Sequence, residues 1–72
     1  SPAIMALLAA TGHENPVVRQ AAIEALAGQD RWPPEVVKRV EAASANDVSP
    51  QVKQAAAMAL EAQRQAEAAK GR

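Results

Sequence analysis

A phrase of twelve residues occurs twice in this chain, at an interval of 34 residues. It reads NPVVRQAAIEAL at residues 15–26 and SPQVKQAAAMAL at residues 49–60. From the proline of each phrase onward, seven of eleven positions are identical, and Arg19 corresponds to Lys53. Self-similarity at a period of this length is typical of solenoids, which stack short structural units on one another. The chain is therefore predicted to contain two copies of one structural unit.

Proline marks the expected start of each helix. Residues 1–2, 15–16 and 49–50 are Ser-Pro or Asn-Pro pairs, which place a good N-cap before proline at the first helical position. Residues 32–35 (WPPE) supply a fourth start. No stretch alternates apolar and polar residues usefully, and Phe and Tyr are absent, so strands are not expected. We expect an all-α fold with four helices, near residues 2–11, 16–28, 34–45 and 50–69.

Each repeated phrase places small apolar residues on one face of its helix. In the first phrase these are Val18, Ala22, Ala25 and Leu26, with Ala21 beside them. In the second phrase they are Val52, Ala56, Ala59 and Leu60, with Ala55 beside them. These two faces are expected to form the core, with Leu26 and Leu60 as equivalent buried positions.

The pattern P-x-V-R/K-x-A-A-x-x-A-L, in a second helix after a shorter apolar one, resembles HEAT-like repeats. The short repeats of phycobilisome-lyase-type proteins are the particular type that it resembles. The resemblance covers nearly all of the chain as two repeats, about 1–31 and 32–72, and implies one domain of two stacked helix–turn–helix units. It further implies that the second helices line a concave surface, and that an acidic loop residue pairs with the Arg. Glu14 and Asp47 are the available carboxylates. Tetratricopeptide repeats share the period, but their Trp-Leu-Gly-Tyr pattern is missing.

The residues offer little to a catalytic or metal-binding site. Cysteine is absent, which excludes disulfide bonds and thiolate ligands. His13 and Glu14 supply at most two of the ligands that a metal needs, so His13 is expected to be an exposed loop residue. The hydroxyls of Thr11, Ser44 and Ser49 lie at expected helix ends, where capping explains them. No catalytic residue, cofactor or metal is predicted, and the protein is not expected to be an enzyme.

The charge balance disfavours two classes of partner. Eight basic and eight acidic residues cancel, with a net charge of −2 over residues 1–36 (two basic, four acidic) and +2 over residues 37–72 (six basic, four acidic). A nucleic-acid binder is expected to be markedly basic. The longest apolar run, residues 3–10, is too short to span a bilayer. Neither nucleic acid nor a membrane is an expected partner, and a cytoplasmic location is favoured.

The two ends of the chain differ in polarity. Ile4, Met5, Leu7 and Leu8 cover more of the first helix than one neighbour can bury, which predicts an open edge there. The tail EAQRQAEAAKGR (61–72) has no large apolar residue, and suits either the polar cap of a solenoid or a fraying helix end. We expect a piece of a longer protein that ends at its natural C-terminus, and whose first helix self-associates or meets preceding repeats.

The polar faces of the second and fourth helices are the candidate contact surface. Met58 stands out there, because an adaptable apolar side chain on a polar stripe suits binding. Trp32, the only aromatic residue, either plugs the seam between the repeats or anchors a partner. Arg19 and Lys53 either bridge to loop carboxylates or form a basic row. The candidate partner-binding residues are Gln20, Glu24, Gln54, Met58, Glu61, Gln65 and Trp32.

Non-catalytic protein–protein interaction, or scaffolding, is the function that these observations favour. The partner is expected to be a protein or peptide. An accessory part of a lyase-type enzyme is the first alternative, since the short-repeat relatives include chromophore lyases. A nucleic-acid-binding HEAT-like domain is the second, although a Gln/Glu/Met stripe suits it poorly.

Overall fold

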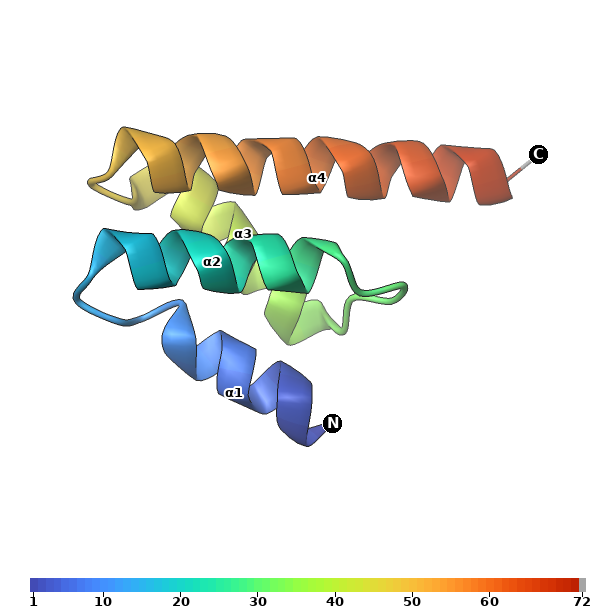
Figure 1. Ribbon diagram of the computed structural model, residues 1–72. Coiled ribbons are helices and arrows are strands. Elements are labelled where there is room, and N and C mark those ends of the chain that lie inside the picture. The colour runs from blue at the N-terminus through green and yellow to red at the C-terminus, as the bar shows by residue number, and fades with distance from the viewer. Residues whose placement is uncertain (72) are drawn as a thin grey trace.

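Four helices make up the computed structural model, which describes residues 1–71 (Figure 1). They are α1 (Pro2–Ala10), α2 (Pro16–Ala27), α3 (Pro34–Asn46) and α4 (Pro50–Lys70). Each bound lies within one residue of its expected position, and no strand occurs over residues 1–71. Arg72, the last residue of the expected polar tail, lies outside the described residues. The all-α prediction is confirmed.

The helices begin where local capping dictates. The side chains of Ser1, Asn15 and Ser49 each accept a hydrogen bond from a backbone N–H of the first helical turn. Proline follows each of them at the first helical position. α3 has no such side-chain cap, because Pro33 occupies the N-cap position. The boundaries therefore depend on short-range interactions that a sequence states directly.

The helices form two hairpins, α1–α2 and α3–α4, of which the second helices lie side by side. Figure 1 shows α2 and α4 running in the same direction, with α3 crossing behind them. α4 packs extensively against both α2 and α3, whereas α1 packs mainly against α2 and more sparsely. The molecule measures 40 × 27 × 15 Å, so it is thin in one direction.

The core is a single cluster shared by three helices. α1 contributes no buried residue, although Ile4, Leu7 and Leu8 pack half-buried against the cluster. The expectation of a thin core is therefore met, because few side chains larger than alanine are fully enclosed. The buried cluster consists of Ile23, Leu26, Val36, Val40, Val52, Ala56 and Ala59.

The expected core face of α2 needs a correction. Ala21 and Ala25 are exposed, whereas Ile23, which the sequence pattern left out, is fully buried. Leu60 is only half-buried, although Leu26, its equivalent one repeat earlier, is 0% exposed. The physical reason is the position of each helix in the stack. α2 lies between α1 and α4, whereas α4 has neighbours in α2 and α3 alone.

Candidate functional site

Arg19 joins the turns of the two hairpins. Its guanidinium donates to both carboxylate oxygens of Asp47, from Nε to Oδ2 at 2.9 Å and from Nη2 to Oδ1 at 3.0 Å. Its Nη1 donates to the backbone carbonyls of His13 and Glu14, each at 2.9 Å. Asp47 Oδ1 also accepts a hydrogen bond from the backbone N–H of Ser49. One side chain therefore holds the turn before α2 against the turn before α4.

This ion pair is largely shielded from solvent. The side chains of Arg19 and Asp47 are only 14% and 11% exposed. The hydrogen bond from Arg19 holds the pKa of Asp47 below its ordinary value. The interpretation of Arg19 as a bridge to a loop carboxylate is confirmed, with Asp47 as its partner. Lys53, the equivalent residue of α4, is exposed and makes no ion pair within residues 1–71.

Thr11 and His13 also have structural partners. Arg39 of α3 donates from Nη1 to the Thr11 hydroxyl at 3.0 Å, and the Thr11 hydroxyl donates to the carbonyl of Leu8. Arg39 therefore places positive charge at the C-terminal end of α1, where the helix dipole favours it. His13 Nδ1 accepts from the backbone N–H of Asn15 at 3.0 Å, and the residue is exposed. These polar groups support turns and helix ends.

A groove runs between α2 and α4 on one side of the molecule. It consists of two adjoining hollows of about 220 and 130 Å³, which share Glu24, Ala55 and Met58. Alanine forms much of its apolar lining, and Met58 stands 65% exposed within it. Gln20 donates to Glu24 from Nε2 to Oε2 at 3.1 Å, which holds two polar groups in place at the edge. The α2–α4 groove is lined by Gln20, Glu24, Ala27, Gln51, Gln54, Ala55, Met58, Ala59 and Ala62.

The structure brings four of the candidate partner-binding residues together in this groove: Gln20, Glu24, Gln54 and Met58. Glu61 and Gln65 lie further along α4, where Gln65 Nε2 donates to Glu61 Oε2 at 3.2 Å. Both are exposed and line neither hollow of the groove.

The sequence analysis missed the alanine lining of the groove. Ala55, Ala59 and Ala62 follow one another at spacings of four and three residues, which is the periodicity of one helix face. That spacing was a usable signal, but the pattern assigned Ala55 and Ala59 to the core alone.

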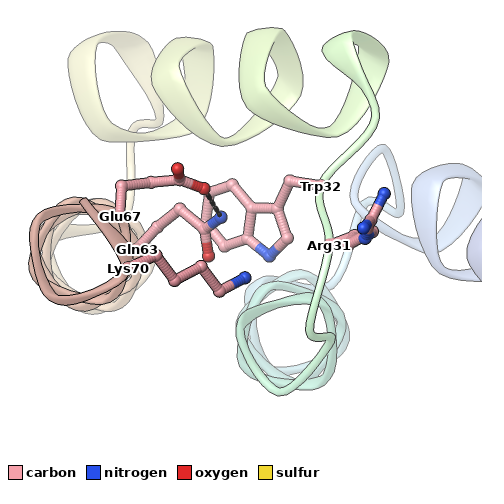
Figure 2. A pocket seen from close by; sticks show the side chains of 5 residues that line it. All are labelled: Arg31, Trp32, Gln63, Glu67 and Lys70. Atoms are coloured by element: carbon pink, nitrogen blue, oxygen red, sulfur yellow. Dashed lines mark hydrogen bonds between the residues drawn. The ribbon is translucent and has the colours of Figure 1, made fainter. Parts of the chain in front are cut away.

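Trp32 lies apart from the groove, beside the C-terminal half of α4. Figure 2 shows Gln63, Glu67 and Lys70 projecting from α4 toward the indole, while Arg31 points away from them. These five side chains surround a polar hollow of about 370 Å³. The indole N–H donates to the carbonyl of Leu26 at 2.9 Å.

The indole is half-buried against the core. Its position and its hydrogen bond to the end of α2 agree with the interpretation of Trp32 as a plug at the seam. The N–H of the ring is already satisfied there.

A family model describing HEAT repeats matches residues 1–70. The chain belongs to the HEAT-repeat family. No curated protein and no solved structure gave a significant match. HEAT repeats commonly mediate protein interactions, and the family is generally non-catalytic. Within residues 1–71 of this HEAT-repeat domain, no group of three or more metal-ligating side chains occurs, and no helix has the length and apolar character to cross a membrane.

Proposed function

We propose that this HEAT-repeat domain is a non-catalytic interaction module that binds a protein segment in the α2–α4 groove. The observation that carries the proposal is Met58, a large apolar side chain that stands 65% exposed beside an alanine lining. Methionine is flexible and polarizable, so it adapts to different apolar partners. An exposed apolar surface with a polar edge is typical of a protein-binding site.

The groove suits a helical or extended peptide with a few apolar side chains. Small alanine side chains let another backbone approach closely, and amphipathic segments commonly dock in such grooves. The glutamines at residues 20, 51 and 54 offer amide donors and acceptors to the polar groups of that segment. Glu61 and Gln65 extend the polar surface along α4, and we include them, with Trp32, as secondary contact candidates.

The organisation of the chain is part of this proposal. We place the boundary between the two repeats near residues 31 and 32, because α2 ends at Ala27 and α3 begins at Pro34. We further propose a scaffolding role within a longer HEAT-repeat protein.

Two other functions are less well supported. No Lys or Arg lines the α2–α4 groove, which disfavours nucleic acid as its ligand. Membership of the phycobilisome-lyase type, and with it an accessory role in an enzyme, rests on the resemblance of the repeated phrase alone.

Selection of peptides from a displayed library against the parent chain tests the proposal. The chain has two methionines, so methyl-labelled methionine gives one NMR probe in the groove, Met58. We expect the selected peptides to shift the Met58 signal and to bind Met58→Gln at least tenfold more weakly. Val48→Gln is the matched control, because Val48 is 91% exposed outside the groove. Peptides that bind both variants as tightly as the parent would show that the groove is not the site.

A further inference from the structure

Equivalent residues of the two hairpins differ in burial, and the differences are complementary. Leu26 is 0% exposed, whereas Leu60, 34 residues later, is half-buried. Ala59 is 4% exposed, whereas Ala25, 34 residues earlier, is exposed. Leu26 and Ala59 belong to the same core cluster. Since the residue types are identical at each pair, neighbours alone account for the difference in burial.

An apolar surface is left open on the side of α2 that faces away from α4. Residues 51, 55 and 59 of α4 line the groove against α2, and their equivalents on α2 are residues 17, 21 and 25. Their spacing of four residues places these on one helix face. All three are exposed, Val17 at 71%, and α1 adds Met5 at 70%. We call Met5, Val17, Ala21 and Ala25 the N-terminal face.

α4 carries the matching surface at the other end of the stack. α2 meets the second hairpin through Arg19, Ile23 and Leu26, which pair with Asp47 or join the shared core. The equivalent residues of α4 are Lys53, Ala57 and Leu60, and we call them the C-terminal face. Lys53 and Ala57 are exposed and Leu60 is half-buried.

We propose that a second copy of this chain stacks head to tail, with the C-terminal face of one copy against the N-terminal face of the next. The contact continues the register of the internal stack, in which Leu26 and Ala59 share one core. Leu60 of one copy then approaches Ala25 of the next. The alanines of both faces allow the two helices to approach closely.

Charge also favours this orientation. Residues 1–18 contain one side-chain carboxylate, Glu14, and no Lys or Arg. Head-to-tail stacking brings Lys53 of one copy to the turn that holds Glu14 in the next, as Arg19 reaches the turn that holds Asp47. Two-fold pairing of N-terminal faces would bring the two Glu14 side chains together without a basic partner.

The contact is expected to be weak. Ala57 replaces the larger Ile23, and Lys53 cannot reproduce the two-point contact that Arg19 makes with a carboxylate. A head-to-tail contact also does not close on itself, so the average mass should rise continuously with concentration.

Two single variants separate the possible geometries. Ala21→Glu blocks the N-terminal face and Ala57→Glu blocks the C-terminal face, and both replace exposed helical alanines with a good helix former. By sedimentation, we expect the parent to associate with concentration and each variant to stay monomeric. An equimolar mixture of the variants should form a dimer that grows no further, because one intact face of each kind remains.

Methyl NMR reports the contact directly. In labelled Ala57→Glu, which keeps its N-terminal face, the Met5 signal should shift when unlabelled Ala21→Glu is added. Circular dichroism of each variant checks that the fold is retained. Three results would overturn the proposal: a parent that stays monomeric up to about 1 mM, association abolished by Ala21→Glu but kept in Ala57→Glu, or association that neither change affects.

Discussion

The guanidinium of Arg19 and the carboxylate of Asp47 form a two-point ion pair that joins residues 28 positions apart in the chain. Because Arg19 also binds the carbonyls of His13 and Glu14, it fixes both turns at one end of the stack. Asp47 in turn binds the N–H of Ser49, the N-cap of α4. The pair therefore sets how the second hairpin is placed on the first.

Replacing Arg19 by lysine tests this geometry while keeping the charge. A lysine ammonium is a point charge and cannot make the planar two-point contact of a guanidinium. We expect Arg19→Lys to lower the Tm, measured by circular dichroism at 222 nm. Lys53→Arg is the control, since Lys53 is exposed, and its Tm should match that of the parent. Equal melting of all three proteins would mean that the ion pair does not hold the stack together.

The pH dependence of stability should carry the signature of Asp47. Its pKa is lower in the folded chain than its ordinary value of 3.8, so the unfolded state binds the proton more readily. The stabilisation is therefore fully present above that ordinary value, and is lost as the pH falls through the lowered pKa of the folded state.

Urea unfolding of the parent and of Asp47→Asn measures this effect. The gap between their midpoints should be wide at about pH 7 and should narrow in strong acid, where Asp47 is protonated in both states. A gap that stays constant down to about pH 2 would assign the loss in Asp47→Asn to something other than the charge of the carboxylate.

Burial predicts unequal effects for the two repeated leucines. Leu26 is 0% exposed within the core, so Leu26→Ala should cost about 2–4 kcal/mol. Leu60 is half-buried, so Leu60→Ala should cost roughly half as much. Trp32 fluorescence during urea unfolding measures both, since Trp32 packs against the core. Equal losses would indicate that Leu60 is as enclosed as Leu26, for instance in an assembly that covers it.

The sequence predicts the helix boundaries well and the buried positions less well. Asn15 and Ser49 accept backbone hydrogen bonds only two or three residues away, so short-range pattern is enough to place the helix starts. Whether an alanine is buried depends on which helix lies beside it. Ala25 and Ala59 occupy the same place in the repeated phrase, yet only Ala59 has a neighbouring second helix on its side. The groove, which needs both helices, has the same dependence.

Met58 separates an open stack from a closed bundle. It is 65% exposed on α4, so Met58→Gln should change the free energy of unfolding by less than about 0.5 kcal/mol, as is usual at surface positions. The measurement is urea unfolding of dilute protein, with Leu26→Ala as the reference for a core change. A loss of several kcal/mol in Met58→Gln would require α4 to be covered on its groove side as well. A small loss, together with weaker peptide binding, is the combination expected of a side chain that the fold leaves available to a partner.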